Sequence, residues 1–295
     1  MEPTLPRRTV AYDGKLTRSA RWDRFRPRAD DIFICTPPKS GTTWMQAICA
    51  LLIFGRPDIG HNPANLSPWL DAEFEPIDDL CARLDAQQHR RSIKTHTPLD
   101  GIPYFPDCTY LAVYRDPRDV YFSMRSHADN MRYPVFGDLF GGEVGPGFRR
   151  WVDTEWLPGD ADTFSLSGIA HHYRSFRAFA DRPNLHFFHY DEMLRDLSGT
   201  MAAVARVLGI AIDAATMAAL VRAAGFDNMQ ANAERFAPNA GTGRWKDERR
   251  FFNRGGSGQW QGLLTDEDLA LYDTRLRTLL PEAEIAWLQH GNISA

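Results

Sequence analysis

The residues at positions 39–43 are of the types that bind phosphate or sulfate: a lysine, a glycine and three hydroxyl side chains. The apolar run at 32–35 predicts a buried strand before them, which Pro37 and Pro38 would end. The apolar run at 44–54 predicts a helix packed on a sheet. A glycine-containing turn at a helix N-terminus presents unpaired N–H groups to an anion. We therefore predict a P-loop-like anion-binding loop made of Lys39, Ser40, Gly41, Thr42, Thr43 and Trp44.

Other interpretations of this loop remain open. It is not the Walker A sequence of magnesium-nucleotide enzymes, Gly-x-x-x-x-Gly-Lys-Ser/Thr, because Lys39 precedes the glycine. That difference disfavours an ATP- and magnesium-dependent small-molecule kinase on a P-loop scaffold, which stays an alternative. A non-catalytic nucleotide-binding module is another. The simplest alternative is an ordinary strand-to-helix turn that contains a lysine.

Polar residues also stand at the ends of three further predicted strands, at 91–94, 109–114 and 184–190. In open α/β sheets, ligands bind beyond the carboxyl ends of the strands. The polar residues at these ends are Lys94, His96, Arg115 and Tyr190. Four such ends in one chain predict a shared binding site at one edge of the sheet.

Arg115 is a candidate phosphate ligand because a guanidinium group makes forked pairs with phosphate oxygens. Ser123 lies eight residues later, about two turns into the next predicted helix, and can add a neutral donor. A surface ion pair of Arg115 with Asp116 or Asp119 is the alternative.

His96 is a candidate general base, since an imidazole titrates near neutrality and can take a proton from a hydroxyl group. A structural role is the alternative for a lone histidine. Arg254 is followed by Gly255 and Gly256, and glycines allow backbone N–H groups to approach an anion closely. A flexible surface loop is the alternative there.

The pattern along the chain predicts one domain over residues 1–295, an α/β fold with a central parallel sheet flanked by helices. Residues 1–30 are Arg-rich and irregular, and we expect them to form a lead-in. The glycine-rich, aromatic segment 128–165 is expected to be a long loop that acts as a lid. After the first helix, the pattern predicts helices at 77–89, 117–126, 169–179, 201–208, 214–224, 226–235 and 265–280.

Composition limits the functional classes. The net charge of −4 argues against nonspecific nucleic-acid binding. Four cysteines without Cys-x-x-Cys spacing predict reduced thiols and no metal site. The N-terminal residues lack the apolar segment of a secretory signal, and the longest apolar run, at 45–54, is too short to cross a bilayer. We therefore expect a cytoplasmic protein without stable membrane insertion.

Four motifs resemble one known family, the cytosolic-type sulfotransferases, which use 3′-phosphoadenosine 5′-phosphosulfate (PAPS); the last of them is the loop 253–260, which resembles the family's Arg-Lys-Gly-x-x-Gly-Asp-Trp signature. The segment 38–44, Pro-Lys-Ser-Gly-Thr-Thr-Trp, is similar residue for residue to the 5′-phosphosulfate loop of the family. The segment 94–98 resembles its Lys-Thr-His-Leu-Pro motif, and 115–123 resembles its 3′-phosphate motif. The resemblance covers about 30–260, with the motifs in family order.

The resemblance implies transfer of a sulfuryl group to a hydroxyl of a small apolar, aromatic or glycolipid acceptor, with 3′-phosphoadenosine 5′-phosphate (PAP) as product and no metal. It implies that His96 is the base in an in-line displacement and that Lys39 and Lys94 stabilise the developing charge. Ser123 would hold Lys39 back until an acceptor binds. The implied nucleotide-binding residues, besides those of the 5′-loop, are Arg115 and Ser123 at the 3′-phosphate, Arg254, Gly255 and Gly256 closing over it, Trp44 and Phe226 around the adenine, and Tyr190.

The chain departs from the family pattern in its C-terminal loop and its dimer motif. Gly255 stands in place of a lysine and Gln259 in place of an aspartate, and the family's short dimer motif is not preserved near 261–266. The sequence therefore leaves the oligomeric state open. The runs 84–91 and 94–101 resemble bacterial members described as glycolipid sulfotransferases, but a phenol or simple alcohol acceptor fits equally well. The segments 55–71 and 128–165 are expected to shape the acceptor pocket.

Overall fold

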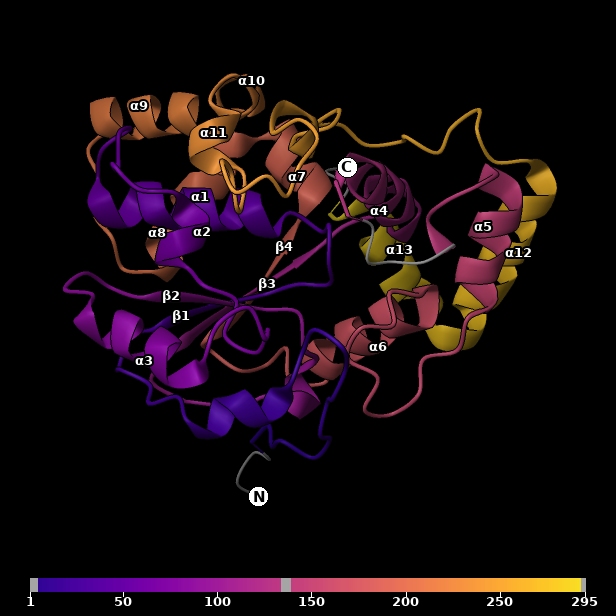
Figure 1. Ribbon diagram of the computed structural model, residues 1–295, viewed down its shortest axis with the longest axis horizontal. Coiled ribbons are helices and arrows are strands. Elements are labelled where there is room, and N and C mark those ends of the chain that lie inside the picture. The colour runs from indigo at the N-terminus through magenta and orange to yellow at the C-terminus, as the bar shows by residue number, and fades with distance from the viewer. Residues whose placement is uncertain (1–4, 134–138, 293–295) are drawn as a thin grey trace.

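A four-stranded parallel sheet forms the centre of the computed structural model, which describes residues 5–133 and 139–292 (Figure 1). The strands lie in the order β2-β1-β3-β4. Their bounds are Ile32–Cys35 for β1, Ser92–Thr95 for β2, Thr109–Tyr114 for β3 and Leu185–His189 for β4. Every pairing is parallel and helices flank the sheet, which confirms the predicted α/β fold.

Each strand contributes to two apolar layers because successive side chains point to opposite faces of a sheet. In β1, Ile32 and Ile34 pack into one layer, whereas Phe33 and Cys35 pack into the other. All four side chains are fully buried. The short strand is therefore apolar throughout, as expected of a parallel strand covered by helices on both sides.

One layer is covered by α1, α8 and α9, which pack against one another above the sheet in Figure 1. The short helices α10 and α11 continue this side, and α7 follows β4 directly. The bounds are Thr42–Phe54 for α1, Pro63–Leu66 for α2, Tyr190–Arg195 for α7, Leu197–Val207 for α8, Ala214–Ala224 for α9, Phe226–Ala231 for α10 and Ala233–Phe236 for α11.

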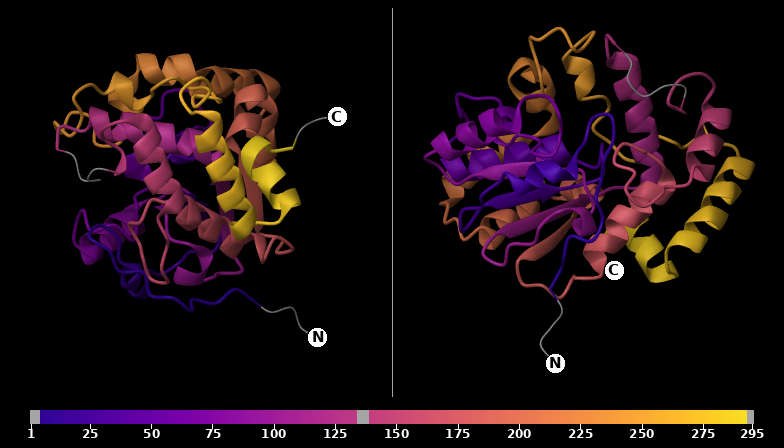
Figure 2. Two further views of the ribbon diagram at one scale, coloured as in Figure 1. Left: turned by 90° about the vertical axis from the view of Figure 1, so that its right-hand side faces the viewer. Right: turned by 60° about the horizontal axis from the view of Figure 1, so that its bottom comes forward.

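The other layer is larger, and Figure 2 shows its C-terminal helices α12 and α13 side by side on the outside of the molecule. The bounds are Ile77–Ala86 for α3, Pro117–Asn130 for α4, Val144–Asp153 for α5, Leu166–Arg177 for α6, Asp266–Leu279 for α12 and Glu282–His290 for α13. The described residues also form the 3-10 helices η1 at Ser19–Asp23, η2 at Leu99–Gly101 and η4 at Arg249–Phe251. Within the described ranges, no helix is both long and apolar enough to cross a membrane.

A buried ion pair joins the starts of two neighbouring strands. Asp31 precedes β1 and Arg91 precedes β2, and Arg91 Nη2 lies 2.6 Å from Asp31 Oδ2. The two side chains are 1% and 0% exposed, so neither charge has water as an alternative partner. A pair of this kind is costly to break from one side only.

The segment 128–165 is not the long loop that we expected, although residues 134–138 of it lie outside the described parts. It contains α5, whose Phe148, Trp151 and Val152 pack into the core. Gly147, one of the glycines of this segment, allows close packing, because a Cβ there would lie 2.6 Å from Tyr121 Oη. The sequence pattern also missed α13, which begins directly after Pro281.

Candidate active site

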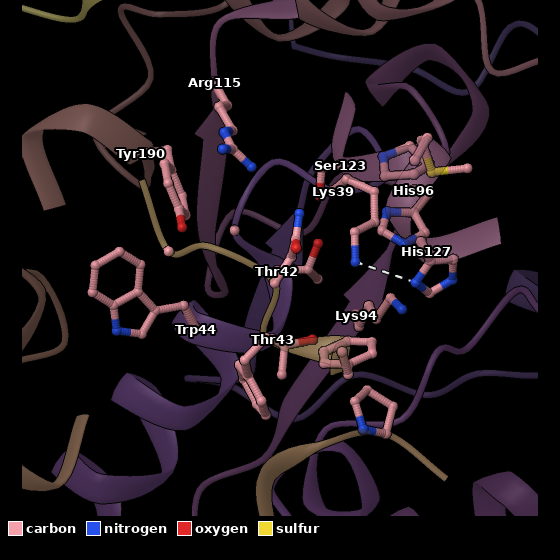
Figure 3. A pocket seen from close by; sticks show the side chains of 18 of the residues that line it. Lys39, Thr42, Thr43, Trp44, Lys94, His96, Arg115, Ser123, His127 and Tyr190 are labelled. Atoms are coloured by element: carbon pink, nitrogen blue, oxygen red, sulfur yellow. Dashed lines mark hydrogen bonds between the residues drawn. The ribbon is translucent and has the colours of Figure 1, made fainter. Parts of the chain in front are cut away.

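The loop after β1 turns back on itself through two residues with positive φ, Lys39 at 65° and Gly41 at 106°. Gly41 is required here because a Cβ would lie 3.1 Å from the Tyr190 ring and because φ is left-handed. Helix α1 begins at Thr42, whose Oγ1 lies 2.6 Å from Thr36 Oγ1. The N-terminus of α1 and the Lys39 side chain therefore face one pocket (Figure 3).

The predicted site residues at the ends of the four strands line this pocket, together with Ser123, Phe226, Arg254 and Gly255. Two predicted residues do not line it: Ser40, which is buried, and Gly256 in the C-terminal loop. Its cationic side chains are Lys39, Lys94, Arg115, Arg244 and Arg254, and its lining includes no aspartate or glutamate among the described residues. Figure 3 shows the side chains of Lys39, Lys94 and His96 close together, with Arg115 and Tyr190 on the other side of the loop. A pocket of this charge suits a polyanionic ligand.

The two lysines have unusually low pKa values. Burial, together with the charges of Arg115 and Lys94, lowers the pKa of Lys39 to about 7. Burial lowers the pKa of Lys94 to about 8, against the opposing effect of Asp71. An anion bound beside them would restore the charged forms, since a nearby opposite charge favours ionisation.

The Lys39 ammonium does not contact Ser123 in this structure, although both line the pocket. Its Nζ lies 3.3 Å from His127 Nδ1 and 4.5 Å from the centre of the Phe251 ring. His127 follows Ser123 by four residues and lies one turn further along α4, on the same side of the helix. The restraint of Lys39 by Ser123 that the family resemblance implied stays a prediction.

His96 is held in one tautomer by its surroundings. Its Nδ1 lies 2.7 Å from the Thr36 carbonyl oxygen, which can only accept, so Nδ1 carries the proton and Nε2 keeps a free lone pair. Burial and the charge of Lys94 lower the pKa of His96 well below its ordinary value. The ring is therefore neutral near pH 7 and can accept a proton at Nε2.

A buried carboxylate fixes the backbone on both sides of His96. Asp71 Oδ2 accepts hydrogen bonds from Thr95 Oγ1 at 2.6 Å and from Thr97 Oγ1 at 2.7 Å. It also accepts from Trp22 Nε1 at 3.0 Å, which ties the lead-in to the site. This arrangement positions the imidazole without contacting it.

Arg115 is buried, at 4% exposure, and its neighbours leave part of its guanidinium unpaired. Its Nη2 donates to the Gly256 carbonyl at 2.7 Å, and its Cζ lies 4.2 Å from the centre of the Tyr190 ring. Its Nε is buried without a hydrogen-bond partner. Asp116 pairs with Arg118 at 2.8 Å instead, so the surface ion pair considered from the sequence is not formed with Asp116.

The glycine-rich C-terminal loop is anchored to α4 by Asp119. Its carboxylate accepts from the backbone N–H groups of Gly258 at 2.9 Å and Gln259 at 2.7 Å. Gln259 Nε2 donates to the Gly256 carbonyl at 3.1 Å, so the residue that replaces the family's aspartate still braces the loop. Arg254 lines the pocket but is otherwise exposed to solvent.

Two aromatic residues predicted to hold the adenine also line the pocket. Trp44 donates from Nε1 to the Ala224 carbonyl at 2.8 Å, and its ring centre lies 5.4 Å from that of Tyr190. Phe226 lies against the C-terminal loop: a Cβ on Gly255, at φ 60°, would lie 2.3 Å from the ring. The loop can approach Phe226 this closely because residue 255 is a glycine.

The far end of the pocket is lined by aromatic residues of other segments. Trp69, from the predicted acceptor loop at 55–71, lies 4.6 Å from the His96 ring centre. Phe74 and Phe164 also line the pocket. A smaller adjoining cavity runs from His96 to Trp156, between α4 and α6. The segment 128–165 thus contributes Phe164 and Trp156 here, while its Phe140, Phe148 and Trp151 pack into the core.

Two buried polar atoms of the predicted site have no hydrogen-bond partner in the described parts of the protein, one on Ser40 beside the pocket and one on Arg115, which lines it. They are Ser40 Oγ and Arg115 Nε. Buried polar groups are rarely left unpaired without a ligand or water. With the lysines at one end and Arg115 at the other, the donor set suits PAPS, whose phosphosulfate and 3′-phosphate are separate anionic groups.

The family model described as the sulfotransferase domain matches residues 29–283. Glycolipid sulfotransferases of Mycobacterium bovis and Mycobacterium tuberculosis are both 37% identical to the chain, over 96% of it and 94% of their own lengths. An amine sulfotransferase of Oryctolagus cuniculus is 26% identical, over 85% of the chain and 81% of its own length.

Two solved structures share the fold. A mouse sulfotransferase complexed with PAP superposes with a TM-score of 0.69 at 22% identity, over 90% of the chain and 89% of its own. A retinol dehydratase in complex with androsterone and PAP superposes with a TM-score of 0.70 at 20% identity, over 90% and 84%. At this identity the likeness concerns the fold.

Proposed function

Because the chain belongs to the sulfotransferase family, we propose that it transfers the sulfuryl group of PAPS to a hydroxyl of a small acceptor, with His96 as the general base. One observation carries the proposal: Lys39, Lys94 and His96 line one pocket with Arg115. An ATP-dependent small-molecule kinase would need the lysines but would have no 3′-phosphate for Arg115 to bind, since ATP lacks one.

Lys39 and the start of α1 would bind the 5′-phosphosulfate, and Arg115 with Arg254 would bind the 3′-phosphate. Arg115 supports this because its Nε lacks a partner and its Nη2 already contacts the C-terminal loop. Trp44 and Phe226 would hold the adenine, and Tyr190 would support Arg115 through its ring. When bound, PAPS supplies the sulfuryl group and PAP leaves.

His96 would take the proton of the acceptor hydroxyl at Nε2, because Nδ1 donates to the Thr36 carbonyl. Its low pKa keeps the ring neutral and available in the free protein. The protonated forms of Lys39 and Lys94 would stabilise negative charge during transfer, as preorganised donors do. Ser123, which lines the same pocket, would hold Lys39 before an acceptor binds.

The acceptor would lie along the aromatic side of the pocket, beside Trp69 and Phe164. Solved relatives contain androsterone or retinol, and the mycobacterial relatives are described as glycolipid sulfotransferases, so an apolar alcohol, a phenol and a glycolipid are all reasonable acceptors. The cytoplasmic location and the lid role of 128–165 stay predictions.

The test is a transfer assay with PAPS and a panel containing 2-naphthol, a primary alcohol and a glycolipid, with product detected by mass spectrometry. His96→Asn keeps a donor toward the Thr36 carbonyl but removes the basic nitrogen. It should lower the transfer rate by about 10²- to 10⁴-fold and leave PAP affinity unchanged. The matched control is His61→Asn at an exposed site, which should behave like wild type.

An unchanged rate in His96→Asn would refute His96 as the base. Phosphoryl transfer from ATP with magnesium, in place of sulfuryl transfer, would favour the kinase alternative instead.

A further inference from the structure

Arg244 is a half-buried cation in the pocket that the proposed chemistry does not use. It lies on the loop between α11 and η4 and lines the same pocket as Lys94 and Trp69. Arg244 belongs to none of the sequence motifs and does not follow a strand, so it was not among the predicted site residues. Its position therefore raises the question of which ligand group it binds.

A continuous series of aromatic contacts connects Arg244 to the proposed base. The His96 ring centre lies 4.6 Å from that of Trp69, and Trp69 lies 5.8 Å from Phe74. The Arg244 Cζ lies 5.3 Å from the Phe74 ring centre and 5.8 Å from that of Trp245. Phe74 is 52% exposed, which places this end of the series at the mouth of the pocket.

No carboxylate of the described residues compensates the charge of Arg244. It forms no ion pair within 4.0 Å in the described ranges, whereas Arg250 nearby pairs with Asp129 at 2.5 Å. Burial lowers the pKa of Arg244 from its ordinary value. A partly desolvated cation without a counterion is unfavourable in the free protein, and a ligand anion would relieve that cost.

The nucleotide does not account for this cation. Under the proposed function, Lys39 and Lys94 stabilise the charge of the phosphosulfate, while Arg115 and Arg254 bind the 3′-phosphate. Arg244 contacts Phe74, which packs on Trp69, so it lies on the aromatic side where the acceptor would bind. Besides burial, the charge of Arg244 lowers the pKa of Lys94, so the anions bound by the two residues would be close together.

We propose that the acceptor is itself anionic: it carries a carboxylate or phosphate that pairs with Arg244, its hydroxyl lies at His96, and an apolar body runs along Trp69 and Phe74. This inference rests on the proposed function and narrows its substrate class. Arg244 would orient the acceptor and would take no part in the proton transfer. The guanidinium lies beside the Phe74 ring, with Cζ 5.3 Å from the ring centre, and it could make a forked pair with an anion.

The test uses ω-(4-hydroxyphenyl)alkanoic acids of increasing chain length and the matched primary amides. Sulfation is followed as kcat/KM, and binding of each compound to the PAP-loaded protein is measured by calorimetry. At the best chain length, wild type should prefer the carboxylate over the amide by about tenfold to a hundredfold. Arg244→Gln should remove that preference, and Arg244→Lys should retain part of it.

Two controls make the test specific. Arg249→Gln changes an exposed arginine of the same segment that does not line the pocket, and it should keep the full preference. PAP affinity should be the same in wild type and Arg244→Gln. A loss of PAP affinity in Arg244→Gln that matches its loss of acceptor affinity would assign Arg244 to the nucleotide and overturn the proposal.

Equal kcat/KM for acids and amides in wild type would overturn the anionic-acceptor inference while leaving sulfuryl transfer intact. An absence of both PAP binding and sulfation of every compound would overturn the proposed function itself. The two failures are therefore distinguishable in one set of measurements.

Discussion

Raising the pH should weaken PAP binding strongly, because Lys39 and Lys94 lose their protons more easily in the free protein than in the complex. The pKa of Lys39 is about 7 and that of Lys94 about 8, whereas a bound anion should return both toward the ordinary lysine value of 10.5. The complex then holds more protons than the free protein above pH 7. By linkage, affinity must fall as the pH rises through this window.

The size of the effect follows from these two values. Between pH 7.5 and 9.0, deprotonation of free Lys39 should weaken binding about twentyfold, and deprotonation of Lys94 about eightfold. Together they predict a loss on the order of a hundredfold. The window lies above the last ionisation of phosphate monoesters, which has a pKa of about 6, so the ligand does not titrate within it.

Calorimetry in buffers of different ionisation enthalpy measures both the affinity and the proton uptake. At pH 8.5 the binding of one PAP should take up about 1.7 protons. Lys39→Arg carries a permanent charge, so its pH dependence should shrink to the part due to Lys94. A change in Kd of less than threefold between pH 7.5 and 9.0, or proton release on binding, would refute this reasoning.

Three further variants test the site and the fold. Arg115→Gln removes the guanidinium that contacts Gly256, and calorimetry should show PAP affinity about tenfold to a hundredfold lower while ADP affinity changes little. An equal loss of affinity for both nucleotides would contradict the assignment of Arg115 to the 3′-phosphate. Gly255→Ala would place a Cβ 2.3 Å from Phe226 at a φ of 60° and should lower PAP affinity severalfold. The control is Gly256→Ala, whose Cβ would come no closer than 3.9 Å to the Arg254 carbonyl oxygen. A larger loss of affinity in the control would show that the loop does not close against Phe226. Asp31→Asn removes the buried carboxylate that pairs with Arg91 and leaves it only the exposed Asp85, at 2.9 Å, as a counterion. It should lower the free energy of unfolding by about 3 kcal/mol in urea. The exposed pair partner Asp78→Asn should lower it by less than about 1 kcal/mol, and similar losses in both variants would contradict the importance of burial.

Local sequence was sufficient for the parts of the site that lie on regular elements. The 5′-loop lies between an apolar strand and an apolar helix, so its position at the edge of the sheet followed from the pattern of residues. His96 directly follows β2 and Arg115 directly follows β3, the strands on either side of β1, and parallel strands bring their carboxyl ends together. The sheet and its flanking helices were predictable for the same reason.

Tertiary packing decided what the sequence left open. Arg244 lies on an irregular loop, and the packing of that loop against Phe74 brings it to the pocket. The glycine-rich composition of 128–165 indicated a loop, but Gly147 in it allows α5 to approach Tyr121. His127 was within reach of prediction, since it lies one turn beyond Ser123 on α4.

The central claim is that this pocket binds a 3′-phosphorylated nucleotide for sulfuryl transfer, and nucleotide selectivity tests it most directly. The measurement is calorimetric titration of the full chain with PAP and with ADP at pH 7.5, without magnesium. The arrangement of Arg115 beside the C-terminal loop predicts that PAP binds at least about tenfold more tightly than ADP. Equal affinity for the two nucleotides, or ADP binding that requires magnesium, would contradict the claim.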